Sequence, residues 1–352
     1  MTELVIRRSA LVHNFRHFAR LTGGSRHIIP VVKANAYGHG ASEVVRALRA
    51  EKPWGFTVAS SQEALELRQQ GIRDRLLILS YWELAEVAQL LKTKTDVIVW
   101  NFESIRQLGD LSTRRRIRTN IYLKIDTGAS RIGIFPHEVK TALALIARFP
   151  FLQLTGVFSH FADAEGKTLA YTKQQWSVFQ HATVGLPSNV LRHISCTAST
   201  IRFSQSHADL VRIGIGLYTH TPVLSWSTQV LQVKKLPANA SVGYGRTFIT
   251  QRPTSIAILP IGYADGFPRS LSNRGSVLIR GKLRPVIGRV CMNLTMVDVT
   301  GAPAVQQGDT AVILGRQGRG ELTAAKVAAD AGTIDYELLS RLPAHLLRRY
   351  DR

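Results

Sequence analysis

The segment HIIPVVKANAYGHG, residues 27–40, decides the fold assignment. Its first half, HIIPVVKA (27–34), is a short continuous apolar run, which is typical of a strand buried on both faces. The glycines that follow lead into a helical pattern over 40–50. Because a buried strand followed by a helix is the repeating unit of parallel α/β folds, the segment predicts such a fold, with Lys33 at the carboxyl end of its first strand.

The same unit recurs along the first part of the chain. Seven further apolar runs are WGFTVA (54–59), LLILS (76–80), DVIVW (96–100), IYLKI (121–125), LQLTGVFSHF (152–161), VLRHIS (190–195) and DLVRIGIG (209–216). Helical patterns separate them, such as SQEALELRQQG (61–71) and HEVKTALALIARF (137–149). Eight such strands predict a (β/α)8 barrel of the TIM type. An open doubly wound sheet is the alternative, but its GxGxxG fingerprint is missing after the first strand.

The pattern changes between Pro222 and Trp226. Shorter strands with turn residues follow, namely TQVLQVKKL (228–236), TSIAILPI (254–261), SVLIRGKLRPVIGRV (276–290), LTMVDV (294–299) and TAVILG (310–315). Two helical segments, TAAKVAADAG (323–332) and YELLSRL (336–342), close the chain. We therefore expect a barrel domain over 1–225 and a mostly β C-terminal domain over 226–352.

Composition excludes several classes of protein. The 352 residues are 45% hydrophobic and 20% charged, which is a globular composition and argues against disorder. No apolar run is long enough for a membrane helix, and MTELVIRR at the N-terminus lacks the apolar core of a secretory signal. Two cysteines, Cys196 and Cys291, do not make a disulfide framework. We expect a cytoplasmic protein without a metal site.

The formal net charge of +21 raises the question of an anionic macromolecular partner. The excess of basic residues is spread over both predicted domains. Its densest cluster is Arg114, Arg115, Arg116 and Arg118, without zinc-finger spacing or an RNA-recognition aromatic pattern around it. We interpret the surplus as an arginine-rich solvated surface, and a nucleic-acid-binding module is the less favoured alternative.

Lys33 is the first candidate for chemistry, because the carboxyl ends of the strands form the active face of a barrel. A lysine after two valines is partly buried, and burial lowers the pKa of an amine. Such an amine can form a Schiff base or act as a base. A solvent-facing charge is the alternative. Tyr37 follows, with Gly38 and Gly40 allowing close backbone approach, and either caps a loop or binds phosphate.

At this point the chain resembles the alanine racemase family, pyridoxal-phosphate enzymes of fold type III. Besides VVKANAYGHG (31–40), the matching segments are KIDTGASRIGI (124–134), GVFSHFADAE (156–165), VRIGIGLY (211–218), VGYGRTF (242–248), IGYADGFPR (261–269) and GRVCMNLTMVDV (288–299). They occur in family order over nearly the whole chain. The resemblance implies pyridoxal 5'-phosphate (PLP) as cofactor, L- and D-alanine as substrates, D-alanine supply for peptidoglycan, and a homodimer with shared active sites.

The resemblance also implies two catalytic bases. Lys33 would carry PLP as a Schiff base and act on one face of the substrate. Tyr244, from the second subunit, would act on the other face. Two bases on opposite sides suit racemisation, because each removes or delivers the α-proton from its own side.

For the cofactor, the resemblance implies that Arg212 bonds the pyridine nitrogen. Since arginine has donors only, that nitrogen stays largely unprotonated, which limits side reactions. His160 would lie between Arg212 and Tyr244. The groups implied for phosphate are Tyr37, Thr197 and the backbone amides of Gly214 and Ile215, with Ser195 and Ser199 as competing hydroxyls.

For the substrate, the resemblance implies that Arg131 faces the carboxylate, as a guanidinium fork suits planar oxygens. Lys124 aligns with a lysine that is carbamylated in many relatives, and an unmodified lysine that leans toward the surface is the alternative. Met292 of the second subunit would offer its backbone amide to the carboxylate, and Tyr263 would line the mouth of the site.

Two departures from the family pattern concern substrate range. Asn293 stands where the family usually has Asp, and our alignment puts Ala344 where some relatives carry a tyrosine that closes the pocket beside the phosphate. A roomier pocket would admit serine, so a broader-specificity racemase is the near alternative. A non-catalytic PLP-binding barrel is the distant one, because that class lacks the β domain and Tyr244. Fold-type-III decarboxylases lack this set of C-terminal segments.

Overall fold

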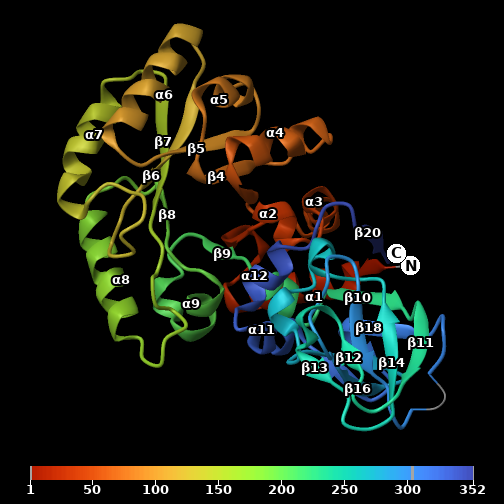
Figure 1. The fold of residues 1–352 in the computed structure, drawn as a ribbon. Helices are drawn as coiled ribbons and strands as arrows, with labels where there is room; N and C mark the ends of the chain where they lie inside the picture. Colours follow the sequence, from red (N-terminus) through yellow and green to blue (C-terminus); the bar gives the residue numbers. More distant parts are fainter. Residues whose placement is uncertain (1, 303–304, 352) are drawn as a thin grey trace. The chain divides into compact units, whose positions relative to one another are not determined.

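The computed structural model describes residues 2–302 and 305–351, and these form two compact units. The barrel unit consists of residues 11–36 and 41–217. The β unit consists of residues 37–40 and 218–351 together with the N-terminal residues up to 10. Figure 1 shows the helices and strands of both units along the chain. No helix in the described residues is both long and apolar enough to cross a membrane.

Within the described residues, the barrel unit has eight parallel strands. They are β2 (Ile28–Pro30), β3 (Phe56–Ser60), β4 (Leu76–Tyr81), β5 (Thr95–Val99), β6 (Thr119–Lys124), β7 (Leu152–Phe158), β8 (Leu191–His193) and β9 (Val211–Ile213). Strands β3 to β8 pair in chain order, and β2 pairs with β9.

Two contacts close the ring. Val31 forms a parallel bridge with Thr57, which joins β2 to β3. The Arg212 N–H donates to the Ser195 carbonyl at 3.1 Å, which joins β9 to β8. The predicted (β/α)8 barrel is therefore confirmed, and the open sheet is excluded.

The strands form because their apolar residues are buried on both faces, as in Val97, Ile98 and Val99 of β5. Helices separate them along the chain: α3 (Ala41–Leu48), α4 (Ser61–Gln69), α5 (Leu84–Leu90), α6 (Phe102–Arg115), α7 (Val139–Ala147), α8 (Ala170–Ala182) and α9 (Thr197–Arg202). Figure 1 shows α6 and α7 along the outer side of β6 and β7. This arrangement leaves the carboxyl ends of the strands on a single face of the barrel.

The β unit is mostly strand, as predicted. Its largest sheet has the order β16-β15-β18-β10-β1-β20, with β19 beside β18. The members are β1 (Glu3–Ile6), β10 (Leu224–Gln229), β15 (Ser276–Ile279), β16 (Lys282–Pro285), β18 (Thr310–Gln317), β19 (Gly320–Leu322) and β20 (Leu347–Tyr350). Smaller sheets join β11 (Gln232–Leu236), β14 (Thr254–Leu259) and β17 (Thr295–Asp298), and β12 (Ser241–Val242) with β13 (Phe248–Ile249). Helices of the chain outside the barrel series are α1 (Arg8–Leu21), α10 (Gly216–Thr219), α11 (Ala324–Ala331) and α12 (Asp335–Ser340).

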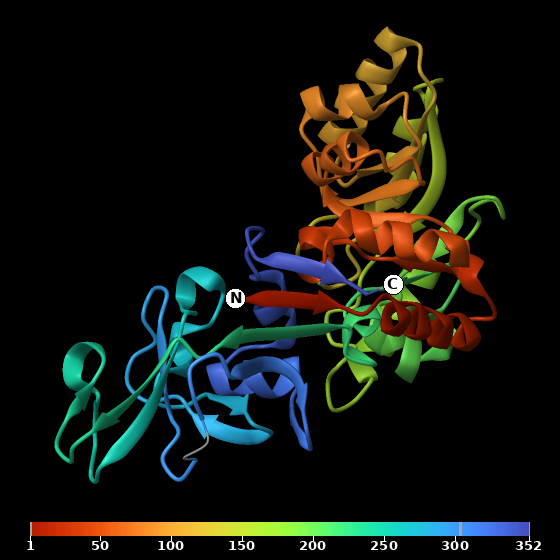
Figure 2. The same cartoon turned by 90° about the vertical axis from the view of Figure 1, so that its right-hand side faces the viewer.

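The first strand of the chain lies in the sheet of the β unit. β1 pairs antiparallel with β10 and parallel with β20, so segments from the two ends of the chain lie side by side (Figure 2). The sequence analysis did not predict this pairing, because the run ELVI (3–6) is too short to indicate which strands it pairs with. The domain boundary after residue 225 remains a proposal.

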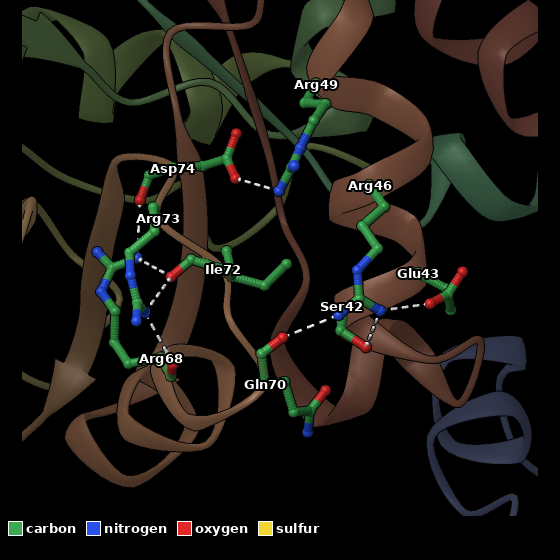
Figure 3. Close-up of polar contacts among 9 residues, drawn as sticks. All are labelled: Ser42, Glu43, Arg46, Arg49, Arg68, Gln70, Ile72, Arg73 and Asp74. Carbon is green, nitrogen blue, oxygen red and sulfur yellow. Dashed lines mark hydrogen bonds and ion pairs between the residues drawn. The ribbon is translucent and has the colours of Figure 1, made fainter.

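Part of the arginine surplus stabilises the backbone of the barrel unit (Figure 3). The buried Arg68 guanidinium donates to three carbonyl oxygens and one hydroxyl at 2.9–3.0 Å, those of Ile72, Asp74, Lys94 and Thr95. Burial lowers its pKa to about 10. Nearby, Arg46 of α3 donates to the Gln70 carbonyl at 2.8 Å, and Arg49 pairs with Asp74 at 2.7 Å. These cations act as hydrogen-bond donors within the fold.

Candidate active site

Lys33 follows β2 after Val31 and Val32, and it starts a left-handed turn, Lys33–Tyr37 (α2). Ala34, Asn35 and Ala36 have φ of 51°, 52° and 54°, and Tyr37 has φ of 52°. This conformation costs roughly 1–2 kcal/mol per residue for side chains other than glycine, so neighbours must hold it. The Ala36 N–H donates to the Val32 carbonyl at 2.8 Å. The sequence analysis expected close backbone approach at Gly38 and Gly40, but it did not predict the left-handed turn.

The Lys33 amine is half-buried, as the two preceding valines indicated. Burial lowers its pKa below the ordinary value, and the positive charges of Arg131 and Arg212 lower it further. Glu63 opposes this effect. A lowered pKa increases the fraction of neutral amine, which is the form that attacks a carbonyl or accepts a proton.

Arg131 lies on the loop that follows β6, and Asp126 shapes that loop. Oδ1 of Asp126 accepts the N–H groups of Gly128, Ala129 and Ser130 at 2.9, 2.9 and 3.1 Å, and Oδ2 accepts that of Arg131 at 3.0 Å. Burial alone raises the pKa of Asp126, but these four donors outweigh it and hold the pKa below its ordinary value. The carboxylate therefore stabilises the loop only while it is ionised.

We expect Asp126→Asn to reduce stability by about 1–2 kcal/mol at pH 7, because an amide nitrogen cannot accept these N–H bonds. The folded-state pKa is depressed, so the wild-type contribution is present above the unfolded pKa of about 3.9 and is lost as pH falls through the folded pKa. The difference between variant and wild type should therefore shrink in acid. Urea unfolding from pH 7 to pH 3 measures it. Asp110→Asn, on the exposed side of α6, is the control with the same charge change. An equal effect at all pH values would contradict the role of the ionised carboxylate.

Arg212 is the buried centre of the barrel mouth. Its Nη2 donates to the carbonyls of Ser159 and Ile194 at 2.8 and 2.9 Å and to Nδ1 of His160 at 3.1 Å. Its Nη1 donates to Nδ1 of His193. Among the described residues, none accepts a hydrogen bond from its Nε, which can therefore donate to a ligand. Burial lowers the pKa of Arg212 to about 10.

Arg212 also decides the protonation of both histidines. Arginine carries donors only, so Nδ1 of His160 and Nδ1 of His193 must accept and each ring must hold its proton on Nε2. Burial, with the charges of Arg212 and Lys124, holds both pKa values well below the ordinary one. His160 is thus a neutral donor through Nε2, a state that the sequence could not reveal.

Lys124 is buried at the end of β6. Its ammonium nitrogen lies 4.5 Å from the ring centroid of Phe158, on β7. Burial and the charges of Arg212 and Arg131 lower its pKa well below the ordinary value. The sequence alternative of a surface lysine is therefore excluded.

These side chains gather at the carboxyl ends of the barrel strands, as predicted. The charges of Arg131 and Arg212 lower the pKa of both Lys33 and Lys124, and the charge of Arg131 also lowers the pKa of Arg212, so these four cations lie near one another. The two carboxylates that act on them, Glu63 and Asp126, both accept backbone N–H groups. The barrel mouth therefore holds an excess of positive charge in a partly dry site, and it favours an anionic ligand.

The three hydroxyls at the end of β8 differ in their contacts. Ser195 Oγ donates to the Ser206 carbonyl at 2.7 Å, and Ser199 Oγ accepts the Cys196 N–H at 2.9 Å as a helix cap. Thr197 Oγ1 instead accepts the N–H groups of Gly214 and Gly216 at 3.2 and 3.3 Å. A Cβ on Gly216 would lie 2.5 Å from Cγ2 of Thr197, so the close approach requires glycine.

Tyr37 belongs to an aromatic cluster of the β unit. Its ring lies 5.1 Å from Tyr218 and 6.0 Å from Tyr336, centroid to centroid. Ala344 is exposed, and its carbonyl accepts from Arg348 at 3.2 Å. Its alignment with a pocket-closing tyrosine of some relatives stays a prediction. Of the two tyrosines beside Tyr37, Tyr336 lies in α12. Tyr336 is the first residue of the segment YELLSRL (336–342), which the sequence analysis treated only as a helix.

Tyr244, Tyr263 and Met292 all lie on loops of the β unit. Tyr244 sits in a 3-10 turn between Gly243 and Gly245, both at φ 70°, and is 71% exposed. The loops of Tyr263 and Met292 are joined by the Tyr263 N–H to Cys291 carbonyl bond (3.1 Å) and the Ala264 N–H to Met292 carbonyl bond (2.9 Å). Met292 is 56% exposed and Asn293 is also exposed. Large exposed apolar side chains on ordered loops are typical of a surface that a partner covers.

In the part of the chain that the structure describes, no group of three or more His, Cys, Asp or Glu side chains could hold a metal ion.

Comparison with known proteins connects both units to one family. Residues 6–222 match the family model "Alanine racemase, N-terminal domain", and residues 223–350 match "Alanine racemase, C-terminal domain". The chain is 36% identical to alanine racemase 2 of Caldanaerobacter subterraneus subsp. tengcongensis, with 99% of this chain and 94% of that protein covered.

Solved structures agree. Alanine racemase from D-cycloserine-producing Streptomyces lavendulae superposes with a TM-score of 0.93 at 32% identity, covering 100% of this chain and 97% of that one. Alanine racemase from Bartonella henselae, solved with covalently bound pyridoxal phosphate, gives a TM-score of 0.90 at 28% identity and 99% coverage of both chains.

Proposed function

The chain belongs to the alanine racemase family and interconverts L- and D-alanine, and from this premise we propose that its barrel mouth binds PLP and that Lys33 and Tyr244 are the two bases. The observation that carries the proposal is the cluster of Lys33, Lys124, Arg131 and Arg212, beside which the carboxylates of Glu63 and Asp126 are bonded to backbone N–H groups. The phosphate of PLP and the carboxylate of an amino acid are the anions that such a cluster fits.

Several features fit the cofactor. The half-buried Lys33 amine, with its lowered pKa, suits covalent attachment of an aldehyde. The Nε donor of Arg212 suits an aromatic nitrogen, and an arginine there would leave that nitrogen without a proton. Thr197 suits phosphate better than Ser195 or Ser199, because the amides of Gly214 and Gly216 fix its oxygen and leave its own proton to donate. We assign Tyr37 and the amide of Ile215 to the same phosphate. The Gly214 amide, which the resemblance also implies, would have to exchange its bond to Thr197 Oγ1 for one to the phosphate.

The bound cofactor would draw electrons from the α-carbon of the amino acid, which makes its α-proton removable. Lys33 Nζ would accept or deliver that proton on one face, and the Tyr244 hydroxyl would do so on the other. His160 would donate through Nε2 to the tyrosine oxygen, because Arg212 fixes its tautomer. Arg131 would bind the substrate carboxylate, and its loop is held by Asp126.

We propose that Tyr244, Tyr263 and Met292 act in the site of a second subunit of a homodimer. Their exposure on ordered loops of the β unit supports this assignment. Tyr263 would then line the mouth of the site, and the Met292 amide would meet the substrate carboxylate.

Lys124 is our candidate for carbamylation. A carbamate forms when a neutral amine adds to carbon dioxide and releases a proton, and the burial of Lys124 favours the neutral amine. The product would place a negative charge beside Arg131 and Arg212. Intact-protein mass spectrometry at neutral and acidic pH would detect the added 44 Da of carbon dioxide.

We further propose that the enzyme acts in the cytoplasm and supplies D-alanine for peptidoglycan. Both cysteines, Cys196 and Cys291, are free thiols, which suits a reducing compartment.

The proposal that the barrel mouth binds PLP and racemises alanine is tested by racemisation assays on a panel of L-amino acids, with the spectrum of the bound cofactor recorded. Turnover without a PLP spectrum, or a PLP spectrum without turnover of alanine, would contradict it.

The same panel tests substrate range. We expect Tyr336→Ala to raise the ratio of serine to alanine kcat/KM by about tenfold, because loss of a side chain beside Tyr37 enlarges the predicted phosphate end of the pocket. Ala344→Tyr should leave the ratio unchanged, since Ala344 is exposed. The opposite pattern would support the alignment of Ala344 with the pocket-closing tyrosine and the broader-specificity alternative.

A further inference from the structure

Glu63 joins the ends of two neighbouring barrel strands. It lies in the first turn of α4, and its Oε1 accepts the Ala34 N–H while its Oε2 accepts the Ala59 N–H, each at 2.7 Å. Ala34 follows Lys33 at the end of β2, and Ala59 lies in β3. Two such charge-assisted bonds are short and strong.

This use of Glu63 departs from its local pattern. Ser60 and Glu63 have the spacing of a helix capping box, in which the glutamate would accept the N–H of Ser60. Ser60 Oγ does accept the Glu63 N–H at 3.3 Å, so half of the box is present. The carboxylate, however, is directed to Ala34 and Ala59 instead. The helix start therefore supplies an anion to the backbone beside Lys33.

The bond to Ala34 acts where the backbone is most strained. Ala34 is the first of four successive residues with φ near 50°, none of them glycine. Its N–H belongs to the peptide unit between Lys33 and Ala34. The bond therefore fixes the orientation of the peptide plane next to the Cα atom that carries the lysine side chain. In the exposed part of the turn, Asn35 Oδ1 also accepts the Ala41 N–H, at 2.9 Å.

Charge gives a second, independent connection. The groups that act on the Lys33 amine come from three elements: Arg131 on the loop after β6, Arg212 on β9 and Glu63 on α4. Both arginines disfavour the ammonium form, and the carboxylate favours it. Neutral His160 faces the same cluster.

We propose that Glu63 is a positioning residue of the racemase, which holds the left-handed turn after Lys33 and balances the two arginines that face the lysine amine. The inference rests on the proposed role of Lys33. Glu63 itself touches neither substrate nor cofactor in this scheme.

The test compares Glu63→Gln with Glu66→Gln. Glu66 lies on the same helix, is exposed, and accepts a bond from Gln62 Nε2 at 3.1 Å, so its change removes the same charge without touching the turn. Full-length protein freed of PLP is treated with an amine-reactive reagent across a pH series, and Lys33 labelling is read by peptide mass spectrometry. Amide exchange of the segment around 33–37 is measured on the same protein and on the holoenzyme.

We expect Glu63→Gln to shift Lys33 labelling toward lower pH, since loss of the negative neighbour disfavours the ammonium form. Exchange in the turn should become at least about tenfold faster. Racemisation should fall by about 10–100-fold, mainly in kcat. Glu66→Gln should match wild type in all three. A labelling shift toward higher pH would indicate mere exposure of the lysine and would overturn the proposal, as would unchanged labelling or exchange.

A second variant decides the matter if Glu63→Gln does not fold. Glu63→Asp keeps the charge but is one methylene too short to span Ala34 and Ala59. It should keep the wild-type labelling profile and still show faster exchange in the turn, and exchange at the wild-type rate would overturn the positioning role. The proposed function is judged separately on wild type: if borohydride does not fix the cofactor on Lys33, that proposal fails whatever the Glu63 variants do.

Discussion

Replacing Lys33 by alanine should reduce racemisation by more than about 10⁴-fold and remove the visible absorbance of the bound cofactor. Loss of a positioned base alone costs about 10²–10⁴-fold, and loss of the covalent attachment adds to this. The Lys33 amine is half-buried, and its burial and two arginines lower its pKa. An alanine at this position supplies no amine, so both the proposed base and the attachment point are lost. Rates in both directions and the absorption spectrum of the purified variant are the measurements.

The control for this variant is Lys140→Ala, at an exposed position of α7, which should retain both activity and spectrum. Borohydride reduction of the wild-type holoenzyme, followed by peptide mapping, should find the cofactor on Lys33. The buried Lys124 is the informative competitor, because its pKa is also depressed. A label on Lys124, or a coloured and active Lys33→Ala protein, would refute the assignment.

Mixing two inactive proteins, Lys33→Ala and Tyr244→Ala, should restore about a quarter of wild-type activity. In the proposed dimer each site takes Lys33 from one subunit and Tyr244 from the other. A heterodimer then has one site with both lesions and one with neither. Random exchange of equal amounts makes about half of the dimers heterodimers, and half of the sites in these are intact.

The mixing experiment requires conditions in which subunits exchange, which native mass spectrometry can follow. Each variant alone should stay inactive through the same treatment. Sites built within one chain would give no recovery, because every chain carries a lesion. Absence of recovery with exchange verified would leave the exposed Tyr244 without its proposed role.

Two carboxylates explain much of how the barrel mouth keeps its cations in place. Asp126 binds four successive N–H groups of the loop that carries Arg131, and Glu63 binds the N–H after Lys33. In both cases an anion stabilises backbone rather than pairing with the nearby cation. The cations therefore keep their charge for a ligand, which a direct ion pair would have cancelled.

The sequence by itself determined the barrel and the mostly β character of the second part, because apolar runs of one length alternate with helical patterns and bury both faces of each strand. It also placed Lys33 at the carboxyl end of a strand, where residues of parallel strands meet at one face. The roles of Lys124, Arg131, His160, Thr197 and Arg212 came from the family resemblance. The family resemblance rested on the same local segments, and both family models confirm it.

Only the tertiary structure decided which groups touch within that frame. The hydrogen bonds of Arg212 fix the tautomers of His160 and His193. These histidines lie 52 and 19 residues from Arg212 along the chain, a separation at which no local pattern indicates a contact. The same holds for Tyr336 against Tyr37, for β1 beside β20, and for the turn of Glu63 away from its capping box toward Ala34. Local periodicity is set by the side chains of neighbouring residues, whereas these contacts depend on the closure of the barrel and of the sheet, which brings together atoms that are remote along the chain.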